Sequence, residues 1–109
     1  IGMEFASIFN SQGVEVTVIE MLDEILGGMD KELSAMLRAE YAKRGIKFML
    51  DTKVVALSEV ASGNGDTQQI QVNYENAEGA GCVIAERLLM SVGRRPVTKG
   101  FGLENLNLD

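Results

Sequence analysis

The feature that most constrains the fold is a short helical pattern followed at once by a β-branched run that ends in an acid. Between Glu4 and Gln12 apolar residues recur at helical spacing, and Gly13 follows as a residue suited to a helix end. The next run, VEVTVI over residues 14–19, is too apolar for a one-sided sheet, so it predicts a parallel strand covered on both faces. Glu20 closes that strand. The apolar helix positions are Phe5, Ile8 and Phe9.

A second helix and strand repeat this order. Asp30 is a candidate N-cap after a loop that contains Gly27 and Gly28, and Gly45 is a candidate stop. The segment IKFML, residues 46–50, reads as the next strand. The helix between them carries an apolar stripe that we expect to face the core, formed by Leu33, Met36, Leu37 and Tyr41.

After residue 51 the pattern changes to short alternating strands, which predicts an antiparallel meander. A last apolar run, RLLMSVG at residues 87–93, predicts a return into a buried sheet that stops at Gly93. No linker divides the chain, so one domain over residues 1–109 is expected. The meander segments are KVVALSEV (53–60), the loop ASGNGD (61–66), QQIQVNY (68–74), the turn ENAEGAG (75–81) and CVIA (82–85).

Composition excludes several classes of function. A net charge of -6 opposes nucleic-acid binding, and no apolar run approaches the roughly 20 residues of a membrane span. Without histidine, and with Cys82 as the one cysteine, an internal disulfide is excluded and zinc or histidine chemistry has few ligands. We read Cys82 as a small buried hydrophobe and the six methionines as core-filling residues. A soluble chain is expected, cytoplasmic or, in a eukaryote, in the mitochondrial matrix.

A helix followed by a buried strand that ends in an acid is the second half of a mononucleotide-binding βαβ unit. In that unit a glycine-rich turn lets a pyrophosphate approach the helix N-terminus, and an acid about 20 residues later accepts hydrogen bonds from the ribose hydroxyls. Gly2 fits the third glycine of the fingerprint and Glu20 fits the ribose acid. The first strand and the earlier glycines are not in the sequence, so we expect a fragment that starts inside the fingerprint.

Two longer segments strengthen this interpretation. IGMEFASIFNSQGVEVTVIEMLDEILGGMDKEL and SVGRRPVTKGFGLENLNL resemble the nicotinamide-dinucleotide domain of the flavoprotein disulfide reductases. The resemblance implies a Rossmann-like three-layer α/β domain with an antiparallel β-meander, its first strand missing. It also implies NAD rather than NADP, because Glu20 would repel a 2′-phosphate. The implied cofactor-binding residues are Gly2, Glu4, Glu20, Met21, Gly93 and Arg94.

The resemblance also implies partners that this chain lacks. The redox cysteine pair belongs to the family's flavin domain, which holds FAD, and the histidine and glutamate acid-base pair belongs to its dimerisation domain. We therefore expect the chain alone to be catalytically inactive, to bind NAD poorly, and to self-associate, for example as a homodimer, through exposed sheet edges. Glutathione, mercuric and coenzyme A disulfide reductases stay open as alternatives, as does an interaction module with no nucleotide role.

Overall fold

The computed structural model describes residues 1–61 and 68–106. The predicted hairpin loop at 61–66 therefore lies outside the described residues except for Ala61, which ends a strand. One short 3-10 helix, η1, in the C-terminal tail had no sequence signal. The elements are α1 (Gly2–Ser11), β1 (Thr17–Ile19), α2 (Lys31–Lys43), β2 (Lys47–Met49), β3 (Lys53–Ala61), β4 (Gln68–Asn76), β5 (Gly79–Ala85) and η1 (Leu103–Asn105).

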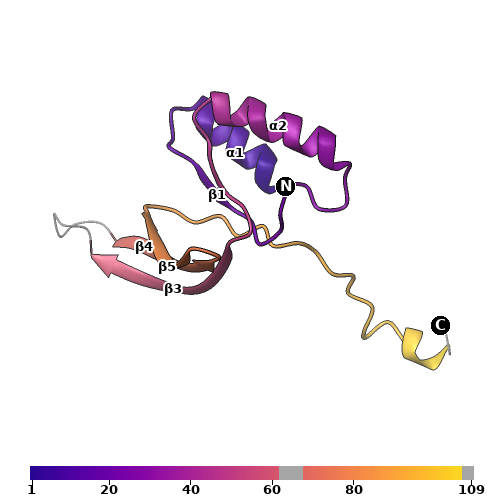
Figure 1. Ribbon diagram of the computed structural model, residues 1–109. Coiled ribbons are helices and arrows are strands. Elements are labelled where there is room, and N and C mark those ends of the chain that lie inside the picture. Colours follow the sequence, from indigo (N-terminus) through magenta and orange to yellow (C-terminus); the bar gives the residue numbers. More distant parts are fainter. Residues whose placement is uncertain (62–67, 107–109) are drawn as a thin grey trace.

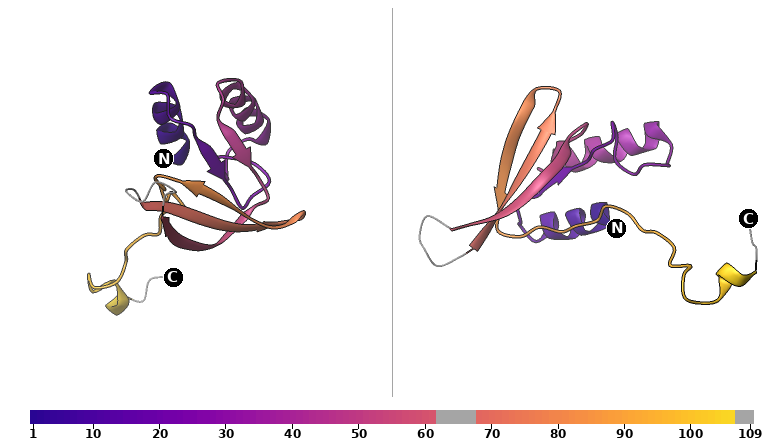
Figure 2. Two further views of the ribbon diagram at one scale, coloured as in Figure 1. Left: turned by 90° about the vertical axis from the view of Figure 1, so that its left-hand side faces the viewer. Right: turned by 90° about the horizontal axis from the view of Figure 1, so that it is seen from below.

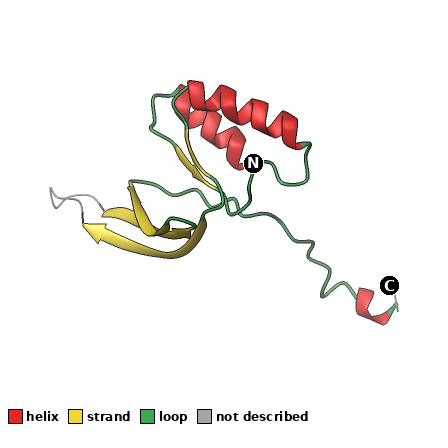
Figure 3. Cartoon of the chain, in the orientation of Figure 1, coloured by secondary structure: helices red, strands yellow, loops and turns green. Residues whose placement is uncertain are grey.

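The elements form three layers. The two helices lie over one side of the short parallel pair β1–β2, and the antiparallel sheet β3–β4–β5 lies on the other side (Figures 1 and 3). The left-hand view of Figure 2 shows the same order from a direction at right angles. This is the predicted α/β architecture with a meander. Neither helix among the described residues is long and apolar enough to cross a membrane.

The parallel pair organises the core. Val18 pairs with Phe48, so these two side chains and their neighbours two residues away share one face of the sheet. That face packs against both helices and the loop between β1 and α2. The pair is shorter than predicted and only half buried, and Val14, 49% exposed, lies outside it. The core is formed by Met3, Ala6, Ile25 and Ile46, with Val16, Val18, Leu26, Leu37, Tyr41, Phe48 and Leu50 packed against them.

The packed faces of the two helices differ in part from the apolar stripes in the sequence. In α1 the buried residues are Met3 and Ala6, whereas the apolar positions at helical spacing, Phe5, Ile8 and Phe9, are exposed. In α2 Ser34 is buried. The face of α2 that packs on the core contains Ser34, Leu37 and Tyr41. The other residues of the expected stripe lie outside this face. The exposed members of that stripe are Leu33 and Met36, at 60% and 63%, and Met21, Met29 and Met90 are likewise exposed rather than core-filling.

The meander has the predicted order with a tighter turn. β4 and β5 are joined at Ala77 and Glu78, so β5 begins at Gly79, three residues before the predicted strand. Cys82 is exposed, against expectation, because alternation along β5 turns it to the face opposite Val83.

Residues 87–93 are not a strand. They run extended past the start of α1 and pair with neither described sheet, so their backbone groups lack the ladder that defines a strand. Their apolar side chains are correspondingly exposed, up to 90% at Val92.

The N-cap of α2 gives a direct test of the fold. The Asp30 carboxylate accepts hydrogen bonds from the backbone N–H groups of Glu32 and Leu33, at 2.9 and 3.3 Å. We expect Asp30→Ala to lower the free energy of unfolding by about 1 kcal/mol, because two helix-end donors lose their partner. Urea unfolding followed by circular dichroism measures this. Asp30→Asn, which keeps a capping oxygen, should cost clearly less, and an equal loss in both variants would contradict the cap.

Candidate functional site

Glu20 lies directly beyond the carboxyl end of β1, as the sequence predicted. Its N–H donates to the Met49 carbonyl at 2.9 Å, and its own carbonyl accepts from the Thr52 N–H at 3.0 Å. Both bonds continue the parallel pairing past the last residue of β1. The backbone of Glu20 is therefore fixed against the end of β2, at the edge where open α/β sheets bind their ligands.

One oxygen of the Glu20 carboxylate accepts a hydrogen bond that orients the side chain, and the other oxygen is available to a ligand. Its Oε1 atom accepts a hydrogen bond from the Leu22 N–H at 3.0 Å. Among the described residues no donor bonds to the second oxygen, and the side chain is half buried. An ionised carboxylate accepts hydrogen bonds only, so the open oxygen is suited to hydroxyl groups of a ligand.

The loop after Glu20 is anchored to β2 and carries backbone strain. The Asp51 N–H donates to the Leu22 carbonyl at 3.0 Å. Leu26 and Asp51 both have left-handed backbones, with φ of 57° and 47°. Such a conformation costs a residue like Leu26 on the order of 1–3 kcal/mol and persists only when its surroundings fix it. Asp51 directly precedes Thr52, which bonds to Glu20, and Leu26 lies in the loop that follows Glu20.

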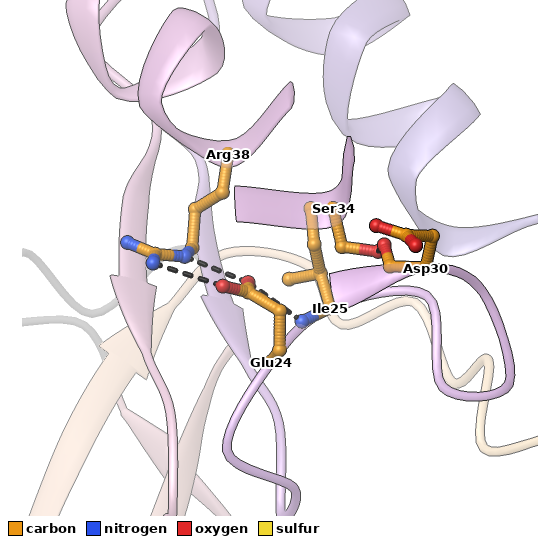
Figure 4. Close-up of polar contacts among 5 residues, drawn as sticks. All are labelled: Glu24, Ile25, Asp30, Ser34 and Arg38. Atoms are coloured by element: carbon orange, nitrogen blue, oxygen red, sulfur yellow. Dashed lines mark hydrogen bonds and ion pairs between the residues drawn. The ribbon is translucent and has the colours of Figure 1, made fainter. Parts of the chain in front are cut away.

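An ion pair fixes the middle of the same loop to α2. Arg38 donates from Nε and from a terminal nitrogen to the two Glu24 oxygens, at 2.7 and 2.9 Å. The Ile25 N–H also donates to Glu24, at 2.9 Å (Figure 4). The Glu24 side chain is only 11% exposed and Arg38 34% exposed, so this contact is shielded compared with a surface pair.

Ile25, which follows Glu24, holds the same loop by apolar packing. It is 2% exposed and joins the core cluster with Met3, which follows Gly2 in α1. Ser34, near the start of α2, donates its hydroxyl to the Asp30 carbonyl at 3.0 Å (Figure 4). The loop and the start of α1 therefore pack together in the core.

Of the other predicted site residues, Gly2 meets the segment that leads to Gly93. A Cβ on Gly2 would lie 2.4 Å from the Ser91 hydroxyl oxygen, so the start of α1 and the extended 87–93 segment meet without room for a side chain. Gly93 follows with a left-handed backbone, φ 111°. Glu4 and Arg94 are exposed. Met21, next to Glu20, is 61% exposed. Among the described residues, no hydrogen bond joins Gly2 or Gly93 to Glu20.

A hollow in the described surface lies away from these residues. It has a volume of about 380 Å³ between the end of β2 and the β4–β5 turn. None of the predicted site residues lines it. In the described part of the chain, no three histidine, cysteine or acidic side chains gather as a metal site. The residues that line the hollow are 48–52 and 76–78.

Sequence reasoning missed Glu24 and Arg38. The available signal was position: Arg38 lies four residues after Ser34 and three before Tyr41, on the packed face of α2. A cation in that row needs a buried or shielded partner. The acidic residues of the preceding loop were the candidates, and the hydrophobic pattern alone did not single one out.

Comparison with known proteins agrees with this architecture. The family model described as pyridine nucleotide-disulphide oxidoreductase matches residues 1–109. The chain belongs to the pyridine nucleotide-disulphide oxidoreductase family. These proteins are flavoprotein disulfide oxidoreductases, as the sequence resemblance implied.

Individual relatives of the chain agree with this family assignment. The chain is 41% identical over 112 residues to a dihydrolipoamide dehydrogenase of Chaetomium thermophilum, covering 100% of this chain and 21% of that protein. It is 39% identical over 110 residues to the mitochondrial dihydrolipoyl dehydrogenase of Caenorhabditis elegans, with the same coverage. A solved structure of the HOCl-induced flavoprotein disulfide reductase RclA of Escherichia coli, a Cu(II) complex, superposes with a TM-score of 0.71 at 29% identity, over 95% of this chain and 21% of that one. The chain thus spans about a fifth of these proteins.

The Glu24–Arg38 pair makes the stability of the chain depend on pH. The Arg38 guanidinium, and then the Ile25 N–H, hold the pKa of the Glu24 carboxyl below its usual range. A lowered folded-state pKa contributes stability above the unfolded pKa, and this contribution is lost as pH falls through the folded value. We expect Glu24→Gln to be less stable than wild type at about pH 7, and the difference to shrink toward about pH 3.

Urea unfolding at a series of pH values measures this difference. Glu78→Gln, at an exposed turn position, is the matched control and should show a smaller difference at every pH. A Glu24→Gln difference that stays constant from neutral to acid pH would contradict the ion pair.

Proposed function

We propose that residues 1–109 form the NAD-binding domain of their oxidoreductase, with Glu20 accepting hydrogen bonds from the adenosine ribose. The observation that carries the proposal is the Glu20 carboxylate, oriented by the Leu22 N–H and with one oxygen open at the carboxyl end of β1. A carboxylate at this edge suits a vicinal diol, since each hydroxyl donates one hydrogen bond. The same negative charge disfavours a 2′-phosphate, which makes NAD the preferred dinucleotide over NADP.

We further propose that Gly2 and Gly93 serve the other half of the dinucleotide. The absence of a side chain at Gly2 supports a close approach to the backbone at the start of α1. In this proposal Glu4 and Arg94 lie toward the nicotinamide and flavin side, and Met21 lies beside the adenosine. Bound NAD would supply the hydride acceptor, while the residues of this chain bind and orient it.

For the whole protein we propose dihydrolipoamide dehydrogenase activity, oxidation of dihydrolipoamide with transfer of electrons through FAD to NAD. The relatives that carry this name at 39% and 41% identity support it. Glutathione, mercuric and coenzyme A disulfide reductases are the alternatives. Because the chain spans 21% of these relatives, FAD, the redox disulfide and the dimerisation domain are assigned to other parts of the longer protein.

The ribose assignment predicts a change in dinucleotide preference. We expect Glu20→Gln to weaken NADH binding by about tenfold and to weaken NADPH binding much less, because a charged acceptor of two hydroxyls is lost while repulsion of the 2′-phosphate is relieved. Fluorescence titration of the full-length protein with each dinucleotide measures both dissociation constants.

Glu59→Gln is the matched control for this experiment. Glu59 lies in β3, exposed and within the meander, so its replacement should leave both constants unchanged. Equal affinities of wild type and Glu20→Gln for NADH would contradict the role of Glu20. No NADH binding by the wild type would favour the interaction-module alternative.

We also propose that the 109-residue chain self-associates when produced alone. β1 and β2 form a two-stranded sheet with free outer edges among the described residues, and such edges pair readily with other strands. Multi-angle light scattering should give a mass well above the monomer value of 11.8 kDa. A monomer at all accessible concentrations would contradict this expectation.

A further inference from the structure

The loop that leads from Glu20 to α2 is held at two places by different means. At its start, backbone bonds tie Glu20 and Leu22 to the end of β2. Four residues after Glu20, Glu24 is bonded through both oxygens to Arg38 in the middle of α2. The Leu22 N–H that orients the Glu20 carboxylate belongs to the first anchor and lies two residues before Glu24.

The anchor at Arg38 differs in kind from the neighbouring ion pair. Lys31 and Asp23 also join α2 to this loop, at 2.5 Å, but their side chains are 74% and 61% exposed. Solvent screens such a pair, and its geometry is not constrained by two parallel bonds. The Glu24–Arg38 contact is shielded, has two bonds, and adjoins the buried Ile25. A planar guanidinium bound in this way fixes orientation as well as distance.

We propose that Arg38 is a positioning residue for adenosine binding, acting through Glu24 on the segment that orients the Glu20 carboxylate. This rests on the proposed function of Glu20. Arg38 itself would touch no part of the dinucleotide. Freed from Glu24, the loop would keep its anchors at β2 and at Ile25 but lose the contact that sets its path between them.

The left-handed Leu26 supports this role. Leu26 lies two residues after Glu24 and has a backbone conformation that a leucine avoids unless its surroundings fix it. Ile25, between them, is buried in the core. The segment from Glu24 to Leu26 is therefore a strained connection held by its contacts, and removal of the ion pair releases one of them.

Binding to two ligands separates positioning from general stability. In the full-length protein, we expect Arg38→Met to raise the dissociation constant for NADH about fivefold. Reduced nicotinamide mononucleotide, which lacks the adenosine half, should bind as it does to wild type. Arg44→Met, at the C-cap of the same helix, is the control, since Arg44 reaches Glu40 only at 3.9 Å and is exposed. Both ligands are measured by fluorescence titration, at a temperature where thermal melts show every variant folded.

Two further variants test that the effect passes through Glu24 and Glu20. In the Glu20→Gln background Arg38→Met should add little to the loss of NADH affinity, because the two residues act in one chain of contacts. The exchanged pair Glu24→Arg with Arg38→Glu should recover most of the NADH affinity. Should Arg38→Met prove unfolded, the exchanged pair and Arg38→Lys, which keeps the charge but not the paired bonds, carry the same comparison.

The outcomes distinguish this inference from the function beneath it. If Glu20→Gln weakens NADH binding but Arg38→Met behaves like Arg44→Met, the positioning role is wrong and the ribose role stands. Equal loss of affinity for NADH and for reduced nicotinamide mononucleotide in Arg38→Met also overturns the positioning role, because it shows a general structural effect. If wild type binds no NADH, both proposals fall together.

Discussion

The parallel pairing of β1 with β2 is the constraint on which the rest of this structure depends. It is only three residues long, yet it sets one apolar face toward both helices and continues through two backbone bonds at Glu20. Those bonds place an acid at the carboxyl end of the sheet, where helix starts and loops gather. Without this register, neither the core around Ile25 nor the oriented carboxylate would form.

Polar contacts fix the loop after β1, because the apolar core is too small to fix it alone. The cluster around Met3, Ala6, Ile25 and Ile46 is short of large buried side chains, and much of the apolar surface is exposed in this chain. The loop after β1 is accordingly fixed by a two-bond ion pair, an N-cap and backbone bonds to Asp51 as well as by apolar packing. Polar contacts specify geometry that apolar burial alone leaves loose, which suits a segment proposed to present a carboxylate to a ligand.

The sequence predicted what depends on local pattern and missed what depends on neighbours. The caps and stops at Asp30, Gly13 and Gly45, the acid after β1 and the meander order all follow from residues close in sequence. The supposed strand at 87–93 failed because a strand requires a partner, and apolar composition does not supply one. Arg38 was missed because its partner Glu24 lies 14 residues away and no periodic pattern joins them.

The most direct test of the central claim is a titration of the isotopically labelled 109-residue chain with NAD, followed by the backbone amide signals. The account predicts that millimolar NAD shifts the amides of Met21 and Leu22, since the latter is bonded to the carboxylate that would meet the ribose. Shifts confined to Ala77 and Glu78, beside the hollow at the meander turn, or no shift at Leu22 at saturation, would contradict it.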